Sequence, residues 1–198
     1  VERRQYRFRV LNGSNSRFYN LSMSNGMEFT QIGSDGGLLK HPVKLTSLLL
    51  APSERADILV NFSDIEPGTS IRLLNDAVAP FPFGGPPDPE TVGQIMQFTV
   101  PVNACKSVKP KELPKVLNYI PTLHSDGPSR IVTTNDIIGP NGLPTEMLLD
   151  GMKWSGPVTE TPRVGSTEDW LIVGMTAGAH PIHLHLIQFQ VISRQNID

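Results

Sequence analysis

The chain has 198 residues, which is enough for one large domain or two small ones. Its formal net charge of −2 argues against a nucleic-acid partner or an anionic membrane surface, since either would call for a basic protein. No apolar run approaches the ~20 residues that a membrane-spanning helix needs. The 17 glycines and 18 prolines are typical of many short strands joined by turns.

Residues 1–101 carry the repeating pattern of an all-β domain. Tyr6, Phe8 and Val10 alternate with Arg7 and Arg9, which predicts a half-buried strand with one apolar face. Similar runs, separated by turn signals about every ten residues, indicate a Greek-key sandwich or barrel. The strands expected in this region are 6–10, 18–23, 27–32, 43–50, 57–62, 71–74 and 95–100.

A Pro/Lys-rich stretch, 102–128, follows and predicts a linker between two domains. It holds the single cysteine, Cys105, which is interpreted as a linker thiol without a disulfide partner. Strand patterns resume in a second region, 129–198, at 130–134, 147–149, 168–174 and 183–193. These strands are too few for a complete domain, and residue 1 runs straight into a strand pattern without a signal peptide. We therefore expect a chain truncated at both ends, whose open sheet edges would favour self-association.

Three of the five histidines lie within residues 180–185, which read HPIHLH. Histidine is the commonest metal ligand in proteins, and imidazole suits copper, zinc, iron and nickel. The flanking apolar runs indicate strands, so the motif is expected on or beside extended backbone. There His183 and His185 would project to one side, with Cα atoms roughly 6.5–7 Å apart, and His180 to the other. Such a trio can hardly close on one ion, but it can serve two metal centres on opposite sides of one strand.

Three other interpretations of the motif are open. The histidines could be structural or surface residues, although three in a cluster are rare where the chain holds only five. A zinc hydrolase could also use His-x-His, but the following residues 186–188 (LIQ) offer no carboxylate or further histidine. A cupin would take its ligands from one barrel and would have no need of His180 on the opposite face.

The run HPIHLH resembles the third copper-binding motif of the multicopper oxidases, the family of the laccases and bilirubin oxidases. The resemblance extends to YRFRVLN at 6–12, IGSDGG at 32–37, LAPSERAD at 50–57 and PVTETP at 157–162. Together these segments span nearly the whole chain and are most similar to the bacterial spore-coat laccase branch. The resemblance implies cupredoxin-like Greek-key β domains, a middle one at 1–101 and the first part of a C-terminal one at 129–198.

The resemblance also implies a copper for each histidine of the motif. His180 would bind the mononuclear type 1 copper, His183 the type 2 copper and His185 a type 3 copper of the trinuclear cluster. A complete member of the family would take single electrons from phenols, aromatic amines or metal ions and pass them to O2, releasing water. By the same resemblance, the protein would lie in the spore coat or otherwise outside the cytoplasm.

Several ligands that the resemblance implies are missing from this chain. A type 1 site uses a cysteine thiolate and two histidines, and the family takes the cysteine and second histidine from a downstream His-Cys-His stretch. Two imidazoles about 7 Å apart cannot hold three coppers. We therefore expect the fragment alone to be inactive and to bind copper weakly if at all. The alternative function is a structural or coat-assembly component that acts without catalysis.

A few other residues are candidates for lesser roles. Glu160 and Asp169 could orient a ligand imidazole through its second ring nitrogen. His41, in a turn, and His124, in the linker, are interpreted as surface residues. Core packing is preferred over a substrate-lining role for three large side chains, Met152, Trp154 and Met175.

Overall fold

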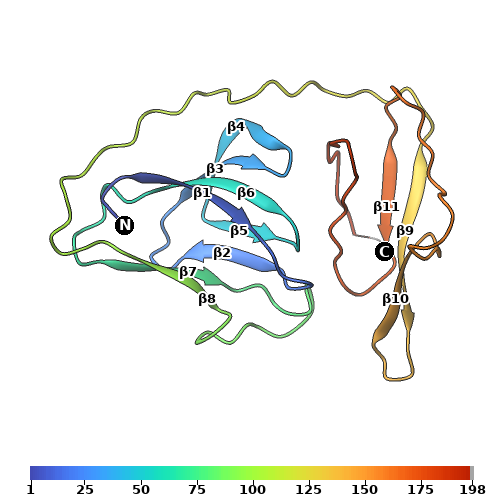
Figure 1. Cartoon of the computed structure of the whole chain (residues 1–198), viewed down its shortest axis with the longest axis horizontal. Helices are drawn as coiled ribbons and strands as arrows, with labels where there is room; N and C mark the ends of the chain where they lie inside the picture. The colour runs from blue at the N-terminus through green and yellow to red at the C-terminus, as the bar shows by residue number, and fades with distance from the viewer. Residues whose placement is uncertain (197–198) are drawn as a thin grey trace. The chain divides into compact units, whose positions relative to one another are not determined.

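A computed structural model of the chain describes residues 1–196. Every helix or strand in that range is a β-strand, so the expected all-β fold class is confirmed (Figure 1). The chain divides into two compact units, Val1–Ile120 and Pro121–Asp198, and the boundary falls within the stretch predicted as a linker. The described range contains no helix long and apolar enough to cross a membrane.

The first unit contains two four-stranded antiparallel sheets. One sheet has the order β1 (Gln5–Leu11), β6 (Arg55–Asn61), β3 (Phe29–Ser34) and β4 (Gly37–Leu45). The other has the order β5 (Ser47–Leu50), β2 (Tyr19–Met23), β7 (Ser70–Asn75) and β8 (Gln94–Thr99). Strands that are neighbours in a sheet are often distant in the chain, as in the Greek-key pattern expected from the sequence.

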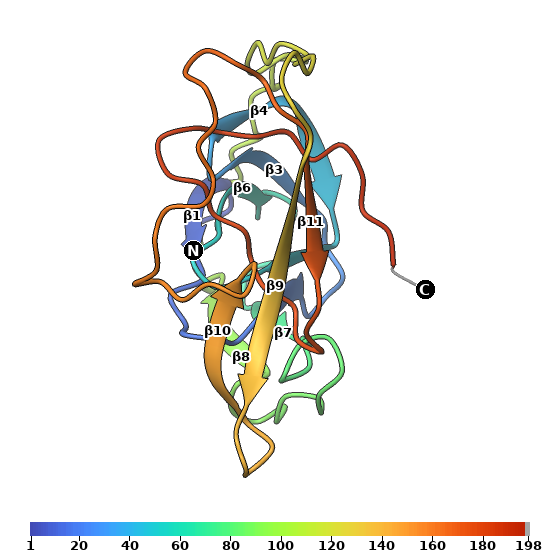
Figure 2. The same ribbon diagram turned by 90° about the vertical axis from the view of Figure 1, so that its right-hand side faces the viewer.

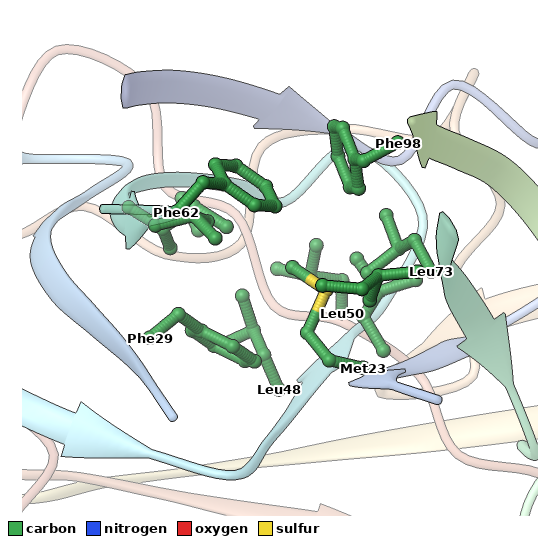
Figure 3. Packing of buried hydrophobic residues seen from close by; sticks show 12 residues of the cluster. Met23, Phe29, Leu48, Leu50, Phe62, Leu73 and Phe98 are labelled. Atoms are coloured by element: carbon green, nitrogen blue, oxygen red, sulfur yellow. The ribbon is translucent and has the colours of Figure 1, made fainter. Parts of the chain in front are cut away.

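One apolar core joins the two sheets of this unit. Figure 3 shows Phe29 from the first sheet and Leu48, Leu73 and Phe98 from the second packed into the same cluster. The ring of Phe62, just after β6, is fully buried among them and lies 5.1 Å from the ring of Phe98 between centroids. In β5 and β7 alternate side chains are buried, so the alternation seen in the sequence becomes part of the inner face of a sandwich.

The single strand predicted at 43–50 is wrong, because this segment forms two strands in different sheets. β4 ends at Leu45 and pairs with β3, whereas β5 begins at Ser47 and pairs with β2. The chain therefore crosses from one sheet to the other at Thr46. An apolar run records which side chains are buried, but it does not record which sheet buries them.

The N-terminal part of the predicted linker runs along the first unit as an irregular strap (Figure 1). The amide of Val108 donates to the carbonyl of Arg3 at 2.8 Å, and the amide of Leu117 donates to the carbonyl of Lys40 at 2.9 Å. The imidazole Nδ1 of His41 lies 2.8 Å from the carbonyl oxygen of Lys115. His41 lies within β4, so its placement in a turn is wrong, but it is exposed, as expected of a surface residue.

The second unit contains a three-stranded sheet of mixed direction (Figure 2). The central strand β9 (Arg130–Ile138) pairs with β10 (Pro144–Leu149) in antiparallel and with β11 (Trp170–Gly174) in parallel orientation. Parallel pairing needs a long connection, and here it includes β10 and the irregular segment 150–169. β11 is the last strand in the described range, and the histidine motif follows it within six residues.

An ion-pair cluster stabilises the start of the parallel pair. Arg130 donates to both carboxylate oxygens of Glu168, Nε to Oε2 at 2.6 Å and Nη2 to Oε1 at 3.2 Å. Arg130 Nη1 also donates to Glu160 at 3.0 Å, and the Trp170 indole donates to Glu168 at 3.0 Å. The side chain of Glu168 is only 4% exposed. The bond from Arg130 lowers the pKa of Glu168; burial opposes this shift, and the bond from Trp170 adds to it.

Replacing Phe62 with alanine should destabilise the first unit by about 3–5 kcal/mol, because the truncation leaves a cavity in a packed core. Urea unfolding followed by circular dichroism measures this. The matched control is Phe83→Ala, since Phe83 is 83% exposed and its loss should cost less than about 0.5 kcal/mol. Equal destabilisation by the two substitutions would contradict the assignment of Phe62 to the core.

Replacing Glu168 with glutamine should lower the free energy of unfolding of the second unit at pH 7. It should also make that free energy depend less on pH below 7. A carboxylate whose pKa is lowered by folding stabilises the fold above its unfolded pKa of about 4.3, and this contribution is lost as the pH falls through the folded value. Both tryptophans lie in the second unit, so tryptophan fluorescence reports its unfolding. The difference in free energy of unfolding between the wild type and Glu168→Gln should become smaller as the pH falls from 7 to about 3. A difference that stays constant over that range would contradict this role of Glu168. The control substitution is Glu66→Gln, because Glu66 is exposed.

Candidate metal centre

The last strand determines where the histidine motif begins. β11 ends at Gly174, opposite Thr134 of β9, and the next amide, that of Met175, donates to the Thr134 carbonyl at 3.0 Å. The chain then bends through residues 176–178 before it reaches His180. The register of the parallel pair therefore fixes the origin of the turn that carries the first histidine.

His180 is held by a residue of this turn. Its Nε2 lies 2.9 Å from Thr176 Oγ1, and the same hydroxyl donates to the carbonyl of Gly178 at 2.9 Å. Both His180 and Thr176 are half-buried. One ring nitrogen of His180 is thus occupied by a local hydrogen bond, as is usual for an imidazole whose other nitrogen binds a metal.

His183 and His185 lie together. Their ring centroids are 5.0 Å apart and the ring planes meet at 72°. Both residues are exposed, whereas Ile182, which precedes them, and Leu184, which lies between them, are half-buried. This alternation is the period of extended backbone, in which residues two apart share a face. The expectation that His183 and His185 project to the same side therefore agrees with the structure.

The strand predicted at 183–193 is wrong, as no strand follows β11 in the described residues. The backbone bends at 185–186, where Leu186 has a φ of 68°, a left-handed conformation uncommon for a leucine. From there to residue 196 the side chains are exposed, including Phe189 and Val191. A strand requires a neighbour for its backbone groups, and the segment is instead bonded through the Gln190 side chain, which donates to the Pro121 carbonyl at 2.6 Å.

The three imidazoles do not converge on one ion. Nowhere in residues 1–196 do three or more histidine, cysteine, aspartate or glutamate side chains gather in a group that could hold a metal. The donors themselves suit copper, since imidazole nitrogens are among its preferred ligands. His183 and His185 could supply two ligands to one centre and His180 a single ligand to another.

The structure gives other roles to the residues proposed to orient the imidazoles. Glu160 accepts from Arg130, in the cluster that holds β9 to β11. Asp169 accepts through its backbone carbonyl, which receives the Arg130 amide at 2.9 Å. The partner of His180 is Thr176, which the sequence interpretation missed. A threonine four residues before a histidine, in a turn with glycine, was the available signal, because threonine hydroxyls in turns often bond to nearby groups.

The core-packing interpretation of the large side chains near the motif is wrong for two of the three. Trp154 is 98% exposed and Met175 is 62% exposed. Met152 is half-buried and its backbone pairs with Leu149 in an isolated bridge. Cys105 is a free, exposed thiol, in agreement with its interpretation as a residue of the linker.

Comparisons with known proteins identify the chain along most of its length. Two sequence profiles, each described as multicopper oxidase, match residues 1–69 and 122–198. The laccase of Bacillus subtilis (strain 168) is 47% identical over 203 residues, an alignment that covers the whole chain. The bilirubin oxidase of Albifimbria verrucaria is 31% identical over 204 residues and matches 98% of the chain.

The fold comparison agrees. The crystal structure of the McoA multicopper oxidase from Aquifex aeolicus matches 98% of this chain with a TM-score of 0.77 and 31% sequence identity. The chain spans 38% of the Bacillus laccase, 34% of the bilirubin oxidase and 42% of McoA. The chain therefore belongs to the multicopper oxidase family, whose cofactor is copper, held in a type 1 centre and a trinuclear cluster.

Proposed function

We propose that the protein carrying these residues is a laccase-like oxidase. It removes single electrons from phenolic or other aromatic substrates, or from metal ions, and reduces O2 to water. The sequence identity to two proteins named as a laccase and a bilirubin oxidase supports this class of reaction. The chemistry of the motif supports it too, because imidazole-rich sites suit the copper ions that carry out such electron transfers.

The observation that carries the proposal is the division of the histidine motif. The rings of His183 and His185 are 5.0 Å apart, whereas His180 is bonded to Thr176 and completes no three-residue metal group with them. We assign His180 to the type 1 copper, His183 to the type 2 copper and His185 to a type 3 copper. One short segment would in this way contribute to both the electron-entry centre and the centre that reduces O2.

The residues of the chain provide position, and copper, when bound, provides the one-electron redox chemistry. His180 is half-buried and held by the turn that follows β11, so its ring is presented from a fixed point of the second unit. His183 and His185 are exposed side by side on extended backbone, accessible to further ligands. The close sequence spacing keeps the two centres near each other, which favours electron transfer between them.

We further propose that these 198 residues alone do not form an active oxidase. A type 1 centre requires a cysteine thiolate and two histidines. The single cysteine of this chain, Cys105, is interpreted as a linker thiol, and it is free and exposed. The assigned cluster ligands are two imidazoles, too few for three metal ions. The remaining ligands would come from other parts of a longer protein. This chain spans 38% of the length of the Bacillus laccase.

Alanine substitutions in the longer protein test the assignment. His180→Ala should abolish the type 1 copper signal in absorption and electron paramagnetic resonance spectra and lower phenol oxidation more than about 100-fold, since even a lost partner of a metal ligand costs about 10- to 100-fold. His183→Ala and His185→Ala should keep the type 1 signal and lose copper from the cluster. The control is His41→Ala, which should keep activity and copper content. A type 1 signal that survives His180→Ala would overturn the assignment.

A copper titration of the 198-residue chain tests the second proposal. Calorimetry with Cu(II) should show only weak binding, which the His183→Ala and His185→Ala double variant abolishes. The physical reason is that two imidazoles leave most coordination positions to water. Tight uptake of three copper ions per chain would contradict the proposal.

A further inference from the structure

We propose that Thr176 is a positioning residue that holds the His180 ring in one tautomer and one orientation, with the proton on Nε2 and the lone pair on Nδ1. The inference depends on the proposed function only in taking His180 as a metal ligand. The tautomer itself is a property of the metal-free chain and can be measured there.

The Thr176 hydroxyl has a single hydrogen but two neighbours within hydrogen-bond distance. Thr176 Oγ1 lies 2.9 Å from the carbonyl oxygen of Gly178 and 2.9 Å from His180 Nε2. A carbonyl oxygen only accepts, so the single hydroxyl hydrogen is donated to Gly178. The contact with His180 then needs a hydrogen from the ring, and Nε2–H is the group that can supply it.

The other tautomer leaves one contact without a hydrogen. With the proton on Nδ1, Nε2 and the Gly178 carbonyl would both be acceptors, and one hydroxyl hydrogen would have to serve both at 2.9 Å. One of the two pairs would then face each other with lone pairs only, at the distance of a hydrogen bond but without a hydrogen between them. The tautomer with the proton on Nε2 satisfies both contacts.

The threonine is itself well placed to act as a support. It follows the last paired backbone group of the sheet by one residue, since the Met175 amide donates to the Thr134 carbonyl at 3.0 Å. The bond to Gly178 closes the turn across residues 176–178. Thr176 thus connects the end of β11 to the ring of His180 through two hydrogen bonds, which orient the ring before any metal arrives.

Nitrogen NMR of the metal-free, ¹⁵N-labelled chain tests the inference. Long-range proton–nitrogen correlations distinguish a protonated ring nitrogen from an unprotonated one, and five histidines give few enough signals to assign with His180→Ala. The spectra are taken at the alkaline end of a pH series, where the ring nitrogen shifts no longer change with pH, so that only the neutral rings are compared. The variants are Thr176→Val, which removes the hydroxyl at nearly constant shape, and Thr176→Ser, which retains it.

The wild type and Thr176→Ser should show His180 in a single tautomer, with Nε2 protonated and Nδ1 unprotonated. Thr176→Val should shift both nitrogens toward the averaged values of a tautomer mixture. Thr145→Val is the matched control, since it removes a threonine hydroxyl that donates to the Ile137 carbonyl at 3.0 Å in the same unit. That control should leave the His180 signals unchanged.

Two results would overturn the inference. One is a wild-type His180 with the proton on Nδ1, which is decisive even if Thr176→Val does not fold. The other is a folded variant with the wrong pattern. Thr176→Val would contradict the inference if it kept a single His180 tautomer, and Thr176→Ser would contradict it if it lost that tautomer. Failure of the proposed function would appear elsewhere, as a type 1 copper that survives His180→Ala.

Discussion

The parallel pairing of β11 with β9 is the constraint on which the position of the histidine motif depends. Arg130 and Glu168 hold the strands together where their pairing begins, and the Met175 amide extends it by one bond where β11 ends. Because the pair is secured at both ends, the turn at 176–178 starts from a defined point. The ring of His180 is then oriented by the Thr176 hydroxyl, which donates to the Gly178 carbonyl and lies 2.9 Å from His180 Nε2.

The motif itself uses the alternation of extended backbone over a very short distance. His183 and His185 share an exposed side because they are two residues apart, and Ile182 and Leu184 are turned toward the half-buried side. His180 has a different environment, half-buried and bonded to the turn. A six-residue segment can in this way present imidazoles to two centres, which is the arrangement that the proposed copper assignment requires.

Local alternation of apolar residues was sufficient to predict much of the first unit. The expected strands at 6–10 and 71–74 correspond to β1 (Gln5–Leu11) and β7 (Ser70–Asn75), because side chains two residues apart are half-buried in β1 and buried in β7. The break at Thr46 was not predictable in this way, because the choice between two sheets depends on partners distant in the chain.

The site was predicted to a similar extent and for similar reasons. The three histidines and the shared side of His183 and His185 follow from spacing alone. The strand expected beyond them depends on a neighbour that the described residues do not provide, and the backbone instead turns at Leu186. The roles of Glu160 and Thr176 were missed because each depends on a three-dimensional contact, with Arg130 and with His180.

The central claim is that one motif supplies ligands to two separate copper centres. Anomalous diffraction at the copper edge, from crystals of the longer protein loaded with copper, tests it most directly. The account predicts one isolated copper peak beside the ring of His180 and a separate group of peaks beside His183 and His185. A single peak coordinated by all three imidazoles would contradict it.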